Sequence, residues 1–175
     1  MQGLYNRETY QYDRKMPQEK LKIYIASSWK NAGTVRELAN LLRENGHMVF
    51  DFTDSHTRES GLDKFCFNIE SWSGEPLETI DWLDFLLYSA TEKAFKSDKA
   101  GIDWADVLIL IVPSGRSSHL EAGYIVGCGK LLYIWGDLPK GEFDTMYKFA
   151  TGCYRSKELP DLLKILKTLK CPKSK

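Results

Sequence analysis

The run Val107-Leu-Ile-Leu-Ile-Val112 constrains the fold of this chain more than any other segment. Six consecutive apolar residues, most of them β-branched, are typical of a strand that is buried on both faces. Such strands occur almost only in parallel sheets that helices cover on both sides. The run therefore predicts an α/β protein built around a central, covered sheet.

Strand-like and helix-like segments alternate around this run. Further strands are predicted at residues 21–26, 47–52 and 131–135, and helices at residues 32–45, 78–97, 118–128, 144–150 and 157–169. In the first helix, Val35, Leu38, Ala39 and Leu42 recur at helical spacing, and Gly46 follows where a glycine ends a helix. The alternation predicts one doubly wound domain over residues 21–170, with a mainly parallel five-stranded sheet and helices on both faces.

Two segments lie outside this pattern. Residues 1–20 are polar and carry several tyrosines without a sustained period, which indicates an arm or a disordered tail. Residues 53–77 are polar and aromatic, and a loop of that length in a compact domain is usually functional or disordered. The aromatic residues favour a lid or a substrate wall, while an unrecognised helix and turn is the alternative.

Composition excludes several classes of protein. The 24 Lys and Arg residues balance the 24 Asp and Glu residues, so no overall field favours nucleic acid or an anionic membrane. No apolar run approaches the roughly 20 residues that span a bilayer, and the N-terminus lacks the apolar core of a signal peptide. The four cysteines are far apart, which indicates neither a zinc site nor a disulfide framework. We expect a soluble cytoplasmic protein.

The loop after Val112 concentrates the unusual chemistry. Ligands of doubly wound sheets bind beyond the carboxyl ends of the strands, where this loop lies. Pro113 ends the strand, Gly115 permits an unusual turn, and Ser117 or Ser118 can cap the helix that follows. With Arg116 beside its first free N–H groups, this helix start predicts a site for a phosphate or carboxylate.

Spacing alone does not make Glu121 a catalyst. Ser118 and Glu121 also fit a capping box, in which the glutamate only binds back to the amide of the capping residue. That interpretation is favoured on local pattern alone. In the same way, Asp106 could be a solvated acid at a strand edge, and we expect His119 to be a surface residue of the first turn.

Four segments, in order, resemble nucleoside 2-deoxyribosyltransferases and their deoxynucleotide N-hydrolase relatives. Tyr24-Ile-Ala-Ser-Ser-Trp29 is similar to the family's opening motif, and Ser97-Asp98-Lys-Ala-Gly-Ile102 to its aspartate-bearing segment. His119-Leu-Glu121-Ala-Gly-Tyr, with Gly129-Lys130, resembles the catalytic-glutamate helix. Asp144-Thr-Met146 falls where a short segment contacts the ligand. The resemblance runs from about residue 22 to residue 168.

The resemblance implies a retaining double displacement on a nucleoside-like substrate. Glu121 would attack the anomeric carbon and form a covalent glycosyl-enzyme intermediate. Asp98 would manage the proton of the leaving base, and Tyr24 would hydrogen-bond the Glu121 carboxylate. No metal or organic cofactor is required. The family also implies a homodimer or higher homo-oligomer with shared sites.

The implied substrate contacts surround these three residues. Trp29 and a lid aromatic such as Phe67 would flank the base. The other expected contacts with the substrate are Ser27, Asp106, Ser114, Gly115, Arg116, Ser117, Ser118, Asp144 and Met146.

Two departures from the family concern the substrate. Family transferases place an acid six residues before the nucleophile to bind the sugar 5′-hydroxyl, and here that position is Gly115, followed by Arg116. An asparagine that a neighbouring subunit contributes in the family corresponds to Asp144. A Gly-Arg-Ser-Ser loop suits a 5′-phosphate, which leaves nucleoside or 5′-monophosphate, and transfer or hydrolysis, open. A TIR-like NAD hydrolase, which shares the flavodoxin-like order, and a non-catalytic nucleotide-binding module are the alternatives.

Overall fold

The sheet has five parallel strands. The structure, a computed structural model, describes residues 20–53 and 79–169. The strands are β1 (Lys22–Ala26), β2 (Met48–Asp51), β3 (Val107–Val112), β4 (Leu131–Gly136) and β5 (Gly152–Tyr154). Their spatial order is β2-β1-β3-β4-β5, and every neighbouring pair is parallel. This is the flavodoxin-like order, and it confirms the predicted fold class.

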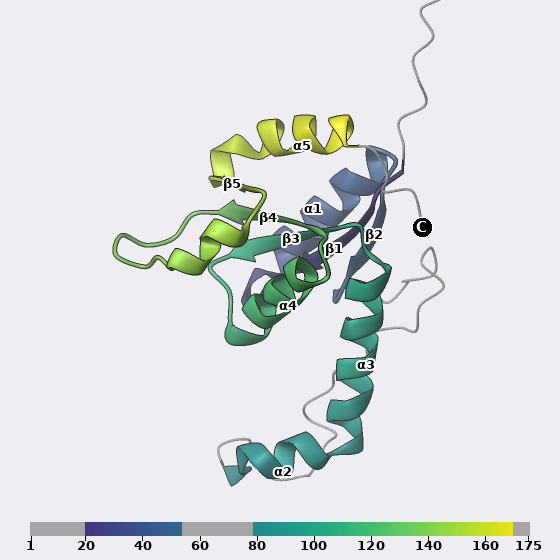
Figure 1. The fold of residues 1–175 in the computed structure, drawn as a ribbon, viewed down its shortest axis with the longest axis vertical. Helices are drawn as coiled ribbons and strands as arrows, with labels where there is room; N and C mark the ends of the chain where they lie inside the picture. Colours follow the sequence, from purple (N-terminus) through teal and green to yellow (C-terminus); the bar gives the residue numbers. More distant parts are fainter. Residues whose placement is uncertain (1–19, 54–78, 170–175) are drawn as a thin grey trace, which may run out of the picture.

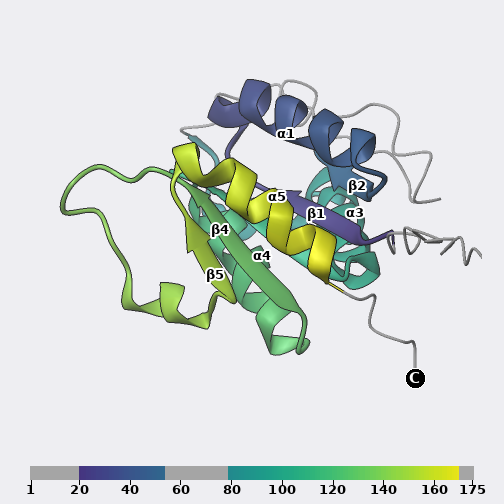
Figure 2. The same ribbon diagram turned by 90° about the horizontal axis from the view of Figure 1, so that it is seen from above.

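Helices cover both faces of the sheet (Figures 1 and 2). On one face, α1 (Ala32–Glu44) and α5 (Leu159–Thr168) pack on alternate strand residues such as Ile23, Ile25 and Ile109. On the other, α3 (Ser89–Trp104) and α4 (Arg116–Gly127) pack on Tyr24 and Leu108. All six side chains of β3 are buried, as the apolar run predicted. Tyr24 therefore points to the face that α3 and α4 cover.

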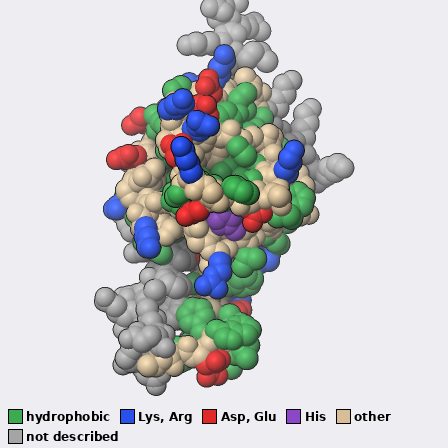
Figure 3. Space-filling view, turned by 90° about the vertical axis from the view of Figure 1, so that its left-hand side faces the viewer, with side chains coloured by type: hydrophobic (Ala, Val, Ile, Leu, Met, Phe, Trp, Pro, Cys, Tyr) green, Lys and Arg blue, Asp and Glu red, His purple; other side chains and the backbone are tan. Residues whose placement is uncertain are grey.

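The predicted helix over residues 78–97 is two helices. α2 (Trp82–Leu87) and α3 are separated by Tyr88, whose extended backbone (φ −67°, ψ 135°) interrupts the helical path. α3 continues to Trp104, farther than predicted. Its first half and α2 project away from the sheet (Figure 1). Hydrophobic side chains gather over this projection at the lower end of Figure 3, and those that are exposed are Trp82, Leu83, Leu86, Leu87 and Phe95.

The remaining predicted elements differ from the observed ones mainly in their bounds. Gly46 lies just beyond α1 with a φ of +86°, the left-handed conformation that glycine adopts at a helix end. The short helix expected near 144–150 is a 3₁₀ helix, η5 (Thr145–Phe149). α5 follows another 3₁₀ turn, η6 (Ser156–Glu158). The position of β5 was not predicted, because three residues (Gly-Cys-Tyr) carry too short a pattern.

β1 and β3 lie side by side although α1, β2, α2 and α3 lie between them in sequence. The strand order reverses at this point, and in sheets of this kind ligands bind beyond the carboxyl ends of the strands at such a reversal. Hydrogen bonds join the two loops that leave these strands. Asn31 Nδ2 donates to Ser27 Oγ (2.9 Å) and to the Pro113 carbonyl (2.8 Å), and Ser27 Oγ donates to the Ile111 carbonyl (3.1 Å).

Candidate active site

Tyr24, Asp98 and Glu121 come together between β1, α3 and α4. The Tyr24 side chain is only 2% exposed and stacks on Phe50, with ring centroids 5.2 Å apart. Its hydroxyl donates to Asp98 Oδ1 at 3.3 Å, and it interacts with the Glu121 carboxylate as well. Two carboxyl groups, from α3 and α4, thus meet at the phenol oxygen of β1.

Gly101 allows this approach. A Cβ at Gly101 would lie 2.9 Å from ring carbons of both Tyr24 and Phe50, closer than packed atoms come. Without a side chain there, α3 rests directly on the rings of β1 and β2. Asp98 precedes Gly101 by three residues and so projects from the same face of α3. Sequence reasoning missed Gly101, although a glycine one turn after a candidate acid was the available signal.

The start of α4 differs from the prediction, and the difference concerns Glu121 directly. The capping position is Gly115, which makes no side-chain cap, so the predicted cap at Ser117 or Ser118 is wrong. Ser118 is the third residue of the helix and only 3% exposed, facing the sheet. Because no residue of this turn is a serine cap, Glu121 is not part of a capping box. Its carboxylate faces Tyr24 and Asp98 instead.

The two carboxyl groups are unusual acids. Burial, followed by the negative charge of Asp98, raises the pKa of Glu121 to about 8, and hydrogen bonding to Tyr24 opposes this. Burial raises the pKa of Asp98 to about 7, again against the hydrogen bond from Tyr24. Burial and then the charges of both carboxylates hold the pKa of Tyr24 well above its usual value. The described residues place neither carboxylate in an ion pair, so the pair retains a proton near neutral pH.

The first turn of α4 has the features of an anion site. Its leading N–H groups have no acceptor within the helix, and the side chains of Arg116 and Ser117 are exposed beside them. Ser114 Oγ, just before this turn, is buried and has no hydrogen-bond partner among the described residues. A buried hydroxyl without a partner is uncommon and calls for a specific reason, such as a bound water, ion or ligand.

Two further predicted substrate contacts, Ser27 and Trp29, follow β1 directly in the sequence. Trp29 lies in the 3₁₀ turn η1 (Trp29–Asn31), is 52% exposed and meets Phe52 edge-on at 4.7 Å. The Ser27 hydroxyl holds the two loops together, as described above. Phe67 and the segment around it lie outside the described residues.

The structure does not bring Asp106 to this site. Asp106 precedes β3, and its Oδ2 accepts a hydrogen bond from the Lys22 amide at 2.9 Å. Both residues are at the amino ends of their strands, on the edge of the sheet opposite Glu121. Asp106 therefore ties β3 to β1 at the amino ends of these strands, and its role as a substrate contact stays a prediction.

Asp144 and Met146 lie on the far side of α4. Asp144 caps η5 by accepting from the Met146 amide at 2.8 Å. η5 runs beside α4 on the side away from α3 (yellow-green, left in Figures 1 and 2). Glu121 faces α3, so one chain does not place Asp144 and Met146 beside its own Tyr24 and Asp98.

His119 lies in the first turn of α4, is half-buried, and has a hydrogen-bond partner at each ring nitrogen. Its Nδ1 lies 2.8 Å from the Gly115 carbonyl oxygen and its Nε2 lies 2.9 Å from Tyr147 Oη of η5. The sequence offered no signal for this contact, because 28 residues separate the two rings.

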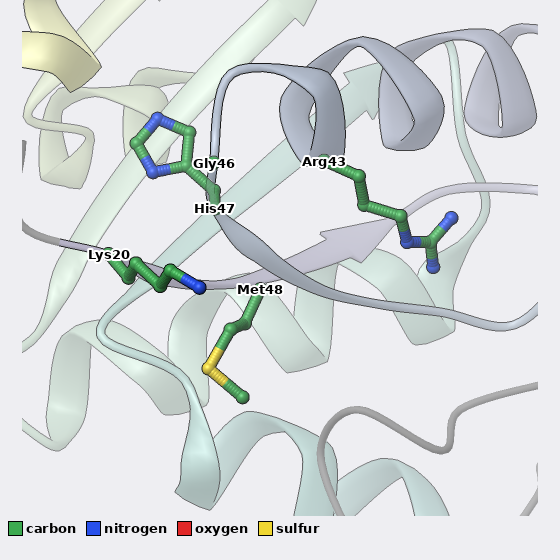
Figure 4. Close-up of a pocket in the computed structure, with 5 residues that line it drawn as sticks. All are labelled: Lys20, Arg43, Gly46, His47 and Met48. Atoms are coloured by element: carbon green, nitrogen blue, oxygen red, sulfur yellow. The ribbon is translucent and has the colours of Figure 1, made fainter.

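A cavity of about 350 Å³ lies elsewhere, at the amino edge of the sheet (Figure 4). Lys20, Arg43, Gly46, His47 and Met48 line it. Arg43 points away from the other side chains, toward Asp51 at 2.9 Å. The described residues contain no helix long and apolar enough to cross a membrane. Nor do those ranges hold a group of three or more side chains suited to a metal ion.

Known proteins similar to this chain are found among solved structures. No protein-family model and no curated protein sequence matches it. Among solved structures, it is similar to the CMP N-glycosidase BcmB of Clostridium botulinum, with a TM-score of 0.48 and 15% sequence identity. The similarity covers 82% of this chain and 96% of that one.

Proposed function

We propose that this protein cleaves the N-glycosidic bond of a nucleoside or a nucleoside 5′-monophosphate through a covalent glycosyl-Glu121 intermediate. The observation that carries the proposal is the meeting of two half-buried carboxyl groups at one phenol, Tyr24, whose hydroxyl is 3.3 Å from Asp98. Two neighbouring acids, one able to attack and one able to give a proton, are what glycoside cleavage requires. The resemblance of the four sequence motifs to nucleoside 2-deoxyribosyltransferases supports the same reaction.

The proposed reaction has two steps. In the first, a Glu121 oxygen bonds to the anomeric carbon while the bond from that carbon to the base breaks, and the base takes the bonding electrons and a proton from Asp98. In the second, water attacks the same carbon, gives its proton to Asp98 and releases Glu121 as a carboxylate. A free base in place of water would complete a transfer. Each turnover begins with one proton shared by the two acids.

The remaining roles follow from position. Tyr24 favours the ionised form of Glu121, because hydrogen bonding to the phenol lowers the pKa of that carboxyl. Trp29, and Phe67 from the segment that is not described, would flank the base. The first turn of α4, with Ser114, Arg116 and Ser117, would bind a 5′-phosphate. The proposed binding partner of the site is a small molecule, a nucleoside or a nucleotide, which is the substrate.

Asp144 and Met146 fit the proposal only as contributions from a neighbouring copy. Within one chain, α4 separates them from Asp98 and Tyr24, and Met146 is 58% exposed. We therefore propose a homo-oligomer in which this segment reaches the site of a second subunit.

The test is chromatographic detection of base release from a panel of nucleosides, deoxynucleosides, their 5′-monophosphates and NAD, with and without added free base. Glu121→Gln should lower turnover of the substrate by at least about 10³-fold, because the nucleophile is lost. Glu92→Gln, an exposed exchange of the same kind on α3, should leave it unchanged. Retained turnover in Glu121→Gln would refute the covalent mechanism, and release of nicotinamide from NAD alone would favour a NAD hydrolase.

A further inference from the structure

The His119 ring joins two segments that are distant in sequence. Nδ1 contacts the carbonyl oxygen of Gly115, which caps α4, and Nε2 contacts the hydroxyl of Tyr147 in η5. The two rings also stack, with centroids 5.8 Å apart and planes inclined by 22°. One imidazole therefore holds both the start of α4 and the connection between β4 and β5.

The chemistry of the partners sets the direction of both hydrogen bonds. A carbonyl oxygen can only accept, so Nδ1 carries the proton and Nε2 accepts from the Tyr147 hydroxyl. Burial, followed by the charge of Asp144, raises the pKa of Tyr147, which keeps that hydroxyl protonated. Both ring nitrogens are thus used.

Each segment held in this way carries residues assigned above to the substrate. The Gly115 carbonyl belongs to the peptide that leads into the first turn of α4, so fixing it orients the free N–H groups of that turn. η5 carries Asp144 and Met146. Resting on the proposed function for the role of these segments, we propose that His119 is a positioning residue that clamps the anion-binding turn of α4 and η5 in one fixed relation. A sugar phosphate then binds without first ordering either segment.

Hydrogen exchange tests the clamp without any need for turnover. The amides of Tyr147 and Ala150 donate to the carbonyls of Asp144 (3.3 Å) and Tyr147 (3.0 Å), so they report whether η5 is formed. Tyr147→Phe keeps the stacked ring and removes the hydroxyl. We expect these amides to exchange roughly fivefold faster in the Tyr147→Phe variant, as the loss of about one net hydrogen bond implies. Tyr154→Phe, which removes a hydroxyl in β5, should leave them unchanged.

Two substitutions of His119 separate its contacts. The amide of His119→Gln reaches the position of Nε2, and the shorter amide of His119→Asn that of Nδ1. The glutamine variant should keep η5 protected and weaken binding of ribose 5-phosphate several-fold. The asparagine variant should lose the protection of η5 and keep the binding of ribose 5-phosphate. A merely structural histidine would change both readouts together.

Unchanged exchange in both Tyr147→Phe and His119→Asn would overturn the clamp. So would equal losses of protection and of ribose 5-phosphate binding in the glutamine and asparagine variants. If the unmodified protein does not bind ribose 5-phosphate, the phosphate site of the proposed function fails, and the exchange rates still decide whether His119 holds η5.

Discussion

At the scale of single residues, the decisive feature is that Glu121 and Asp98 lie together, half-buried, without an ion pair among the described residues. Ion-paired carboxylates have lowered pKa values, whereas these two are raised to about 8 and about 7. A fold selected only for stability would place apolar side chains there, since burying charge costs free energy. Such a pair indicates a site whose proton is used.

The pH dependence of the proposed reaction follows from this pair. The reaction needs one carboxylate and one carboxylic acid, which is the pair with a single proton, whichever oxygen carries it. We expect kcat/KM for base release to follow a bell, with its maximum between the pKa values of about 7 and about 8. Asp98→Asn should abolish the bell. A profile that rises without limit to pH 10 would contradict the shared proton.

The stability of the fold should also depend on pH through Glu121, and it should be greatest where that carboxyl is protonated. The pKa of Glu121 is 4.5 for an exposed group and about 8 in the fold, so the fold prefers the protonated form. Stability is therefore full below pH 4.5 and is lost as the pH rises toward 8. Glu121→Gln removes that loss and should raise the free energy of unfolding on the order of 2 kcal/mol at pH 6, with no gain near pH 4. Thermal unfolding across this range measures it, and a variant less stable at every pH would contradict it.

At the scale of elements, the site depends on how closely α3 and α4 approach β1. Gly101 sets the distance between α3 and β1, because its missing Cβ leaves room for two aromatic rings. The position of the cap sets how α4 lies against β1, because the helix begins at Arg116 and thereby turns Glu121 toward α3. The function we propose is therefore a property of helix packing as much as of the acids themselves.

Gly101→Ala tests the first approach. The added methyl group must displace either the Tyr24 and Phe50 rings or α3, at a cost of roughly 1–3 kcal/mol, partly offset by the helix preference for alanine. We expect a fall in kcat of at least about tenfold with the fold retained. Gly127→Ala in α4, where a Cβ meets nothing within 4 Å, is the matched control and should keep full activity. Equal activity in the two variants would show that the approach of α3 is not critical.

Arg116→Ala tests the start of α4. If Arg116 binds a 5′-phosphate, the substitution should weaken binding of nucleoside 5′-monophosphates by roughly 1.5–3 kcal/mol, the value of a charged hydrogen bond. Binding of nucleosides should barely change. Calorimetric titration with both ligand types measures the difference, and Arg36→Ala on α1 is the control. Equal losses for both ligands would refute the phosphate contact.

At the scale of the whole molecule, the chain has two sets of candidate site residues on opposite flanks of α4. Tyr24, Asp98 and Glu121 face α3, while Asp144 and Met146 lie beside η5. A second copy of the chain is the simplest way to unite them.

Mixing two defective variants tests that arrangement. Glu121→Gln lacks the nucleophile, and the double variant Asp144→Ala with Met146→Ala lacks the segment that would be shared. In a dimer with shared sites, an equal mixture should regain about a quarter of the original activity, because half of the random dimers are mixed and each has one intact site. Activity equal to the mean of the two separate variants would contradict shared sites.

Local pattern determined the alternation of strands and helices, the buried β3 and the loop that holds the chemistry, because burial and helical periodicity are written into neighbouring residues. The resemblance to nucleoside 2-deoxyribosyltransferases, and not local pattern, named Tyr24, Asp98 and Glu121 together. Local pattern could not distinguish a capping glutamate from an active one, since both have the same spacing to Ser118. The tertiary structure excluded the capping glutamate by beginning α4 at Arg116.

The tertiary structure also decided which candidates meet. It moved Asp106 to the opposite edge of the sheet, gave His119 a partner 28 residues away and revealed the role of Gly101. These facts depend on which strands pair and how closely helices pack on them. Contacts between residues far apart in sequence carry no local period, so a sequence without aligned relatives names the chemical groups but not their distances.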